Sequence, residues 1–222
     1  PDNEVPVEVH NSGWVANHTI DFLKRAQGGK PFFAFASFVD PHHSYNPPPP
    51  YSTMYREQDM PPIVARASER QDKPAYYAKL YEAHRPLVEK AARNRTQYYG
   101  EVSLIDDSVG RILQTLDDLK MRENTLIAFM SDHGDLLGDH YLFYKGPYHY
   151  RNCAAVPLMV NWPGRVRSGK KVEGIVQAID VMPTLLDLAG VEAPMGVQGR
   201  SQRAVLTKDS VETGYESALV EG

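Results

Sequence analysis

Apolar and polar residues follow two different patterns along the chain. Short runs that are apolar at nearly every position occur at 31–39, 125–130, 154–160 and, more weakly, 175–178. Segments with an amphipathic or helix-like distribution of apolar residues occur at 13–27, 74–90, 102–119 and 181–188. The first pattern is typical of strands buried on both faces, and the second of helices. The sequence therefore predicts an α/β fold, with a largely parallel mixed sheet flanked by helices.

Prolines interrupt the pattern directly after the first apolar run. Residues 40–51 contain five prolines, which lack an amide hydrogen and fix the backbone, so this segment is predicted to be a stiff loop. The polar stretch 51–73 is predicted to be a long loop or insertion. Ligands of a parallel sheet gather beyond the carboxyl ends of its strands. The segments that follow 31–39 and 125–130 are therefore the first places to search for chemistry.

Composition removes several classes of function. The 222 residues are 42% hydrophobic and carry a formal charge of −4, without a long run of Lys or Arg, so nucleic acid is not an expected partner. The apolar runs are far shorter than the ~20 residues that cross a bilayer, and residues 1–9 lack the regions of a signal peptide. Cys153 is the single cysteine, which excludes an intrachain disulfide and a zinc-thiolate cluster.

The segment Ser131–His140 concentrates acidic and imidazole side chains after the apolar run 125–130. Its sequence, Ser-Asp-His-Gly-Asp-Leu-Leu-Gly-Asp-His, has three carboxylates and two imidazoles in ten residues. Hard divalent cations prefer carboxylate oxygens and tolerate imidazole, so Asp132 and His133 are candidate metal ligands. Asp, Gly and His are equally typical of a turn. The sequence alone leaves both interpretations open, and Asp135, Asp139 and His140 are predicted to stabilise the turn.

Two further groups are candidates for contact with an anion. Lys145 lies in a Gly-Pro turn, where its ammonium could reach an anionic group held by a metal. His42 and His43 follow Asp40-Pro41 in the proline-rich loop. Each of these residues taken singly is more often an exposed surface residue than a functional one.

In order and spacing these segments together resemble the sulfatase family of the alkaline phosphatase superfamily. The resemblance extends over nearly the whole chain and rests on Asp40–His43 with its following prolines, Tyr98–Leu113, Ser131–His140, Lys145–Pro147, Val156–Gly164 and Gln177–Gly190. It implies an alkaline-phosphatase-like fold. It also implies metal-dependent hydrolysis of a sulfuric ester.

The resemblance assigns a role to each candidate residue. Asp132 and His133 would bind a single Ca²⁺ or another divalent cation. Lys145 would hold the sulfate oxygens, and His42 would contact the sulfate or protonate the departing alcohol. Ser44 stands where the family more usually has Pro, which leaves the choice between His42 and His43 as substrate contacts open. Many relatives have Asn at the position of His133, and the Asp-His version also occurs in phosphonate monoester and phosphodiester hydrolases, which are the alternative function.

One element that the family needs is absent from the sequence. Family members form a formylglycine nucleophile from Cys or Ser in Cys/Ser-x-Pro-x-Arg, and the chain has no such motif. The chain is therefore expected to be incomplete at both ends, with 1–205 as the carboxyl-side portion of a catalytic domain and 206–222 as the start of a truncated subdomain. Alone it is expected to be inactive, and a non-catalytic fragment is a second alternative.

The resemblance also implies partners and a compartment. The expected substrate is a sulfated small molecule or glycan, and a periplasmic, secreted or lysosomal location is expected. A domain cut through its sheet would leave an edge and an apolar face uncovered, so self-association is expected. Two ligands are too few for a cation that prefers six to eight oxygens, so we expect weak Ca²⁺ binding.

Overall fold

The computed structural model describes residues 4–220. The last two residues of the expected subdomain 206–222 lie outside the described residues. Contacts divide the chain into two compact units. Unit 1 comprises the residues up to Lys120 together with Asp135–Lys145, and unit 2 comprises Met121–Gly134 together with the residues from Gly146 onward. Among residues 4–220, no helix is both long and apolar enough to cross a membrane.

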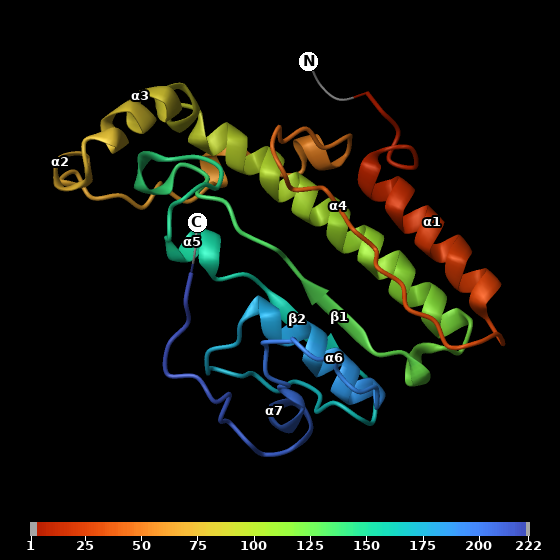
Figure 1. Cartoon of the computed structure of the whole chain (residues 1–222). Helices are drawn as coiled ribbons and strands as arrows, with labels where there is room; N and C mark the ends of the chain where they lie inside the picture. The colour runs from red at the N-terminus through yellow and green to blue at the C-terminus, as the bar shows by residue number, and fades with distance from the viewer. Residues whose placement is uncertain (1–3, 221–222) are drawn as a thin grey trace. The chain divides into compact units, whose positions relative to one another are not determined.

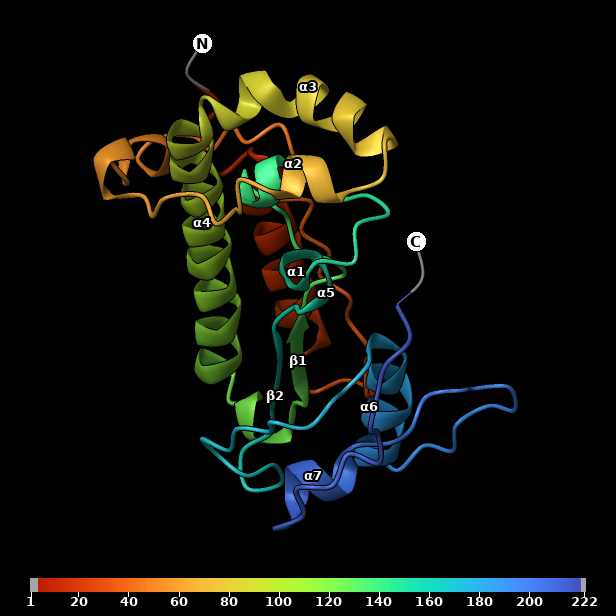
Figure 2. The same cartoon turned by 90° about the vertical axis from the view of Figure 1, so that its left-hand side faces the viewer.

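Unit 1 is built around two long helices, α1 (Asn11–Ala26) and α4 (Ala91–Asp118). They lie side by side in both views (Figure 1, Figure 2). Their buried apolar side chains include Ala16 and Leu23 on α1 and Leu104 and Leu116 on α4. These residues recur at helical spacing, which gives each helix one apolar face to bury. The helices predicted over 13–27 and 102–119 are thus confirmed, although α4 begins eleven residues earlier.

The remaining helices of unit 1 are shorter. They are η1 (Tyr51–Thr53), η2 (Glu57–Asp59), α2 (Glu69–Asp72), α3 (Tyr76–Val88) and η4 (Asp139–Tyr141). The helix predicted over 74–90 is confirmed as α3, and the predicted loop 51–73 contains three short helical turns. Gly100 of α4 permits the close approach of η1, because a Cβ there would lie 2.5 Å from the carbonyl oxygen of Tyr51.

Unit 2 combines a pair of strands with short helices. Its elements are η3 (Arg122–Asn124), β1 (Ile127–Met130), α5 (Arg151–Ala154), β2 (Leu158–Asn161), η5 (Ala178–Asp180), α6 (Val181–Ala189) and α7 (Arg203–Thr207). The predicted helix 181–188 is confirmed, and Gly190 ends it in the left-handed conformation with φ of 73°. Asp180 is fully buried and accepts hydrogen bonds from the amides of Gln177 and Arg200 and from the Tyr215 hydroxyl.

The sheet differs from the sequence prediction. Strands β1 and β2 pair antiparallel, with Ile127 opposite Asn161 and Met130 opposite Leu158. They are the only strands within residues 4–220, so a largely parallel sheet is not formed there. The run 31–39 joins no ladder in the described part of the chain, and 175–178 is not a strand.

The apolar runs are also less buried than predicted. Phe33 is 81% exposed and Phe35 is 80% exposed. Met159 of β2 is 59% exposed. A run that is apolar on both faces needs cover on both faces, and the described residues of its own unit leave Phe33 and Phe35 without it. Burial of this run on both faces is therefore not observed, whereas the uncovered apolar face expected of an incomplete domain is confirmed at Phe33 and Phe35.

The exposed phenylalanines predict self-association of the isolated chain. Exposed apolar side chains on an unpaired extended segment favour association with a second copy. We expect the wild-type chain to elute from a size-exclusion column as oligomers, and the double variant Phe33→Ser, Phe35→Ser to shift toward the monomer. Val191→Ser, which changes another exposed apolar residue outside this run, is the control. A monomeric wild-type chain would contradict the prediction.

Candidate active site

The structure brings two predicted site residues of unit 1 into direct contact. The ammonium Nζ of Lys145 contacts Nε2 of His42, although the two residues are 103 positions apart. Lys145 follows the turn of η4, and His42 lies in residues 40–46, which we call the histidine loop. This loop directly follows the extended run 31–39, which was predicted to be a strand. The loop after that run therefore places the imidazole beside the lysine.

Local contacts define the state of the His42 ring. Its Nδ1 lies 2.7 Å from the carbonyl oxygen of His43. A carbonyl only accepts hydrogen bonds, so Nδ1 carries the hydrogen and Nε2 presents its lone pair to the Lys145 ammonium. In this arrangement the Lys145 ammonium is a hydrogen-bond donor, and an incoming anion could replace His42 as its acceptor.

Aromatic rings lie next to this contact. The His43 ring stacks on His42 with centroids 4.2 Å apart and lies 4.0 Å from the Tyr144 ring. Tyr45 donates a hydrogen bond of 2.7 Å to Asp135. Burial, with a smaller effect of the Asp135 charge, raises the pKa of Tyr45 above its usual range, so its hydroxyl stays a donor.

Asp135 organises the segment that leads to Lys145. Its Oδ1 accepts hydrogen bonds from the amides of Leu137 at 2.9 Å and Tyr144 at 3.0 Å. The predicted turn-stabilising role of Asp135 is thus confirmed. Tyr45 on the same carboxylate links this turn to the histidine loop.

Asp139 and His140 bind other segments of unit 1 in addition to forming the turn. Asp139 accepts hydrogen bonds from the Val64 amide at 2.8 Å and from Arg95 at 2.6 Å. His140 lies 2.9 Å from the buried carboxylate of Glu69. A purely turn-stabilising role is therefore too narrow for these two residues.

Sequence reasoning missed a second set of polar residues beneath the histidine loop. Asp40, the first residue of the loop, accepts a hydrogen bond of 2.5 Å from the hydroxyl of Ser12. Glu101 of α4 is 1% exposed and accepts a hydrogen bond of 2.6 Å from the Asn46 amide. The available signal was periodicity, because position 101 shares the buried face of α4 with Leu104 and Ser108.

Burial changes the acidity of Glu101. It raises the pKa of this carboxyl to about 8; the hydrogen bond from Asn46 lowers it, and the Asp40 charge raises it further. The second oxygen, Oε2, is buried and has no hydrogen-bond partner among the described residues. Glu101 is therefore mainly a neutral acid at pH 7.

The two predicted metal ligands belong to unit 2. The Asp132 side chain is 86% exposed, and its Oδ1 accepts a hydrogen bond from the His133 amide. Gly134 then passes so close to α5 that a Cβ would lie 1.8 Å from the Asn152 carbonyl oxygen. The glycine and its hydrogen bond of 2.9 Å to the Cys153 carbonyl hold the end of this segment.

The free atoms of this pair fit one shared cation. His133 Nδ1 lies 2.9 Å from the Gly134 carbonyl, so it carries the hydrogen and Nε2 keeps its lone pair. Asp132 Oδ2 lies 3.7 Å from that Nε2, a spacing that two ligands at about 2.0–2.6 Å from one cation can have. Within residues 4–220 no group of three or more His, Cys, Asp or Glu side chains could hold a metal. The role of Asp132 and His133 as metal ligands therefore stays a prediction.

The structure places the predicted site residues as two pairs, one within each unit. His42 and Lys145 meet within unit 1, with His43 beside them. Asp132 and His133 are neighbours within unit 2. Convergence of all four side chains stays a prediction.

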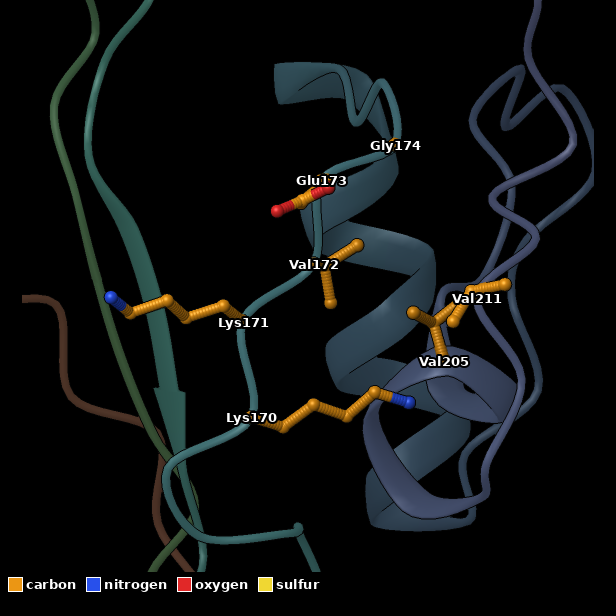
Figure 3. A pocket seen from close by; sticks show the side chains of 7 residues that line it. All are labelled: Lys170, Lys171, Val172, Glu173, Gly174, Val205 and Val211. Atoms are coloured by element: carbon orange, nitrogen blue, oxygen red, sulfur yellow. The ribbon is translucent and has the colours of Figure 1, made fainter.

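A hollow of about 360 Å³ in unit 2 is not this site (Figure 3). Its lining residues are Lys170, Lys171, Val172, Glu173, Gly174, Val205 and Val211. Figure 3 shows Lys170 pointing toward Val205 and Lys171 pointing the opposite way. The Lys170 ammonium donates to the carbonyls of Lys208 and Ser210, so it is already engaged by the protein.

Known proteins are similar to this chain over most of its length. An arylsulfatase of Clostridium perfringens is 37% identical over 204 residues, which cover 89% of this chain and 42% of the relative. The multifunctional alkaline phosphatase superfamily protein PehA of Trinickia caryophylli is 34% identical over 216 residues, covering 90% of this chain and 42% of the relative. The chain thus spans less than half the length of these two relatives.

The fold agrees with a solved structure of the same superfamily. The phosphonate monoester hydrolase SpPMH from Silicibacter pomeroyi superimposes with a TM-score of 0.87 at 26% identity, over 96% of this chain and 44% of that protein. This match supports the alkaline-phosphatase-like fold, although the largely parallel sheet predicted for this chain is not formed among residues 4–220. The sequence model of the Sulfatase family matches residues 10–191. The chain therefore belongs to the sulfatase family of the alkaline phosphatase superfamily.

Proposed function

We propose that this chain is the carboxyl-side part of a catalytic domain that hydrolyses a sulfate ester. The contact between Lys145 and His42 is the observation that carries the proposal. It places a lysine ammonium against an imidazole although the two residues are 103 positions apart in the sequence. The family relatives support the reaction class, and the arylsulfatase of Clostridium perfringens supports a sulfate rather than a phosphate ester.

The residues of the chain would divide the work as follows. Lys145 would leave His42 and donate to the sulfate oxygens, which an ammonium binds more strongly than it binds a neutral imidazole. The vacated His42 Nε2 would then face the ester, where it could take up a proton from water and pass it to the departing alcohol. His43, stacked on His42, would limit rotation of the ring.

Asp132 and His133 would hold part of a single divalent cation, with Ca²⁺ as the first candidate. The cation would supply positive charge for the sulfate oxygens when bound. The remaining ligands and the formylglycine nucleophile would come from sequence outside this chain, because the chain contains no Cys/Ser-x-Pro-x-Arg motif. We accordingly propose 1–205 as catalytic domain and 206–222 as the start of a further subdomain.

A direct assay tests the proposal. We expect the full-length protein that contains this chain to hydrolyse an aryl sulfate with a higher kcat/KM than a phosphonate monoester. Chelation should abolish the activity and Ca²⁺ should restore it. The isolated 222-residue chain should turn over neither substrate and should bind Ca²⁺ weakly in a titration. A micromolar affinity would mean that the site is complete within the chain.

Phosphonate monoester hydrolysis is the second candidate. It is favoured by the similarity to SpPMH and by the imidazole of His133 where many sulfatases have an amide. The same assay separates the two functions. A much faster reaction with the phosphonate monoester would overturn the sulfatase proposal, whereas no turnover of either substrate would favour a non-catalytic protein.

A further inference from the structure

The histidine loop is held at both ends by carboxyl groups. At its start, Asp40 Oδ2 accepts a hydrogen bond of 2.5 Å from Ser12 of α1 and lies 3.5 Å from His10 Nδ1. At its end, the Asn46 amide donates a hydrogen bond of 2.6 Å to Glu101 of α4. His42 lies between these two anchors, so its position depends on α1 and α4 together.

We propose that Asp40 and Glu101 are positioning residues that clamp the two ends of the histidine loop and thereby set His42 against Lys145. The inference rests on the proposed function for the role of His42 and Lys145. It does not depend on which ester is hydrolysed. Neither carboxyl is assigned a contact with substrate, so both would act through the loop.

The clamp also couples the loop to pH. Glu101 faces Asp40 with its partners His10 and Ser12, the Asn46 amide, and Tyr98 on the same helix. None of these gives its buried Oε2 a hydrogen bond. Ionised Glu101 would place a second negative charge beside Asp40 in a site that excludes water, so the closed loop favours the neutral acid.

The direction of the pH effect follows from linkage. With the loop closed, the pKa of Glu101 is about 8, against an ordinary value of 4.5 that applies when water reaches the carboxyl. Between pH 4.5 and pH 8 the Glu101 carboxyl is ionised when the loop is open and protonated when it is closed. The equilibrium constant for opening therefore rises about tenfold per pH unit. Below pH 4.5 and above pH 8 opening becomes independent of Glu101. The loop is therefore held most firmly in acid.

Amide hydrogen exchange of the full-length protein measures this opening directly. In the wild type, we expect protection of peptides covering the histidine loop to fall about tenfold per pH unit from pH 5 to pH 8, after correction for intrinsic chemical exchange. Glu101→Gln keeps an acceptor for the Asn46 amide without a titrating group, so its corrected protection should not change. Glu101→Leu removes the acceptor and should lower protection at every pH.

Asp107→Asn is the matched control. Asp107 is also on α4 and accepts a hydrogen bond of 2.6 Å from Tyr51, outside the histidine loop. This variant should retain the slope of the wild type. A flat wild-type profile, or equal slopes in the wild type and Glu101→Gln, would overturn the proposal. If Glu101→Leu does not fold, the comparison of the exchange slopes of the wild type and Glu101→Gln still tests the proposal.

Kinetics test the second half of the inference. We expect kcat/KM of the wild type to fall relative to Glu101→Gln as the pH rises from 5 to 8. Asp40→Asn should lower kcat more than it changes KM, because a displaced His42 affects the reaction more than binding. Hydrogen exchange does not require turnover. A protein with the exchange slope but no sulfatase activity would refute the proposed function alone, and an active enzyme without the slope would refute the clamp alone.

Discussion

Replacing Lys145 with alanine is expected to lower kcat/KM of the full-length protein for its sulfate ester by about 10²–10³-fold. This is the range measured when one preorganised donor to a developing negative charge is removed from an active site. Lys145 is suited to that role because its ammonium contacts the His42 imidazole, and among residues 4–220 it forms no ion pair with a carboxylate.

Two further variants make the Lys145 test specific. Lys145→Arg keeps the charge but cannot reproduce a compact ammonium at the same place, so we expect it to restore only part of the activity. Lys171→Ala changes another lysine, which lies in unit 2 and is not among the proposed site residues, and should retain wild-type kinetics. Unchanged kcat/KM in Lys145→Ala would remove Lys145 from the site and with it the basis of the proposed function.

Replacing Arg95 with methionine is expected to destabilise the protein by about 3–5 kcal/mol, the usual cost of removing one partner from a buried ion pair. The Arg95 side chain is 6% exposed and forms an ion pair of 2.6 Å with Asp139. It also donates to the carbonyls of Leu137, Pro61 and Pro62. Methionine would leave these acceptors without their donor and Asp139 without its cation.

Urea denaturation measures this loss as a lower free energy of unfolding. Arg111→Met is the matched control, because Arg111 is on the same helix but is exposed, and its guanidinium donates to the side chain of Asn17. It should change the free energy by less than about 0.5 kcal/mol. The double variant Arg95→Met, Asp139→Asn should recover part of the loss, since the unpaired charge is removed as well. Equal stabilities of Arg95→Met and Arg111→Met would contradict the expectation.

The hydrogen bonds of Arg95 to Leu137 and Asp139, which we call the Arg95 cluster, also connect the stability of the protein to the position of Lys145. Leu137 and Asp139 flank the turn that leads to Tyr144 and Lys145. Arg95 ties this turn to α4 at two points. Loss of the cluster would therefore displace Lys145 as well as lower stability, which explains why a guanidinium, with donors in several directions, suits this position.

The sequence by itself determined the helices, the stiff loop and the candidate residues. Helical spacing over 13–27 and 102–119 is a local property of the chain, and so is the exclusion of regular structure by prolines in 40–51. The motifs around His42 and Lys145 were readable for the same reason. The tertiary structure brings the two residues into contact within unit 1.

Only the tertiary structure decided the burial of Glu101 and Arg95 and the exposure of Phe33. Charged side chains on a helix are usually solvated, and their burial depends on which distant segments cover that face. For Glu101 this is the histidine loop, and for Arg95 it is the turn at 137–139. A strand is likewise defined by its partners, because its amides must pair with another segment. The run 31–39 has strand composition but lacks such a partner within residues 4–220, so the same residues that predict a buried strand are left exposed.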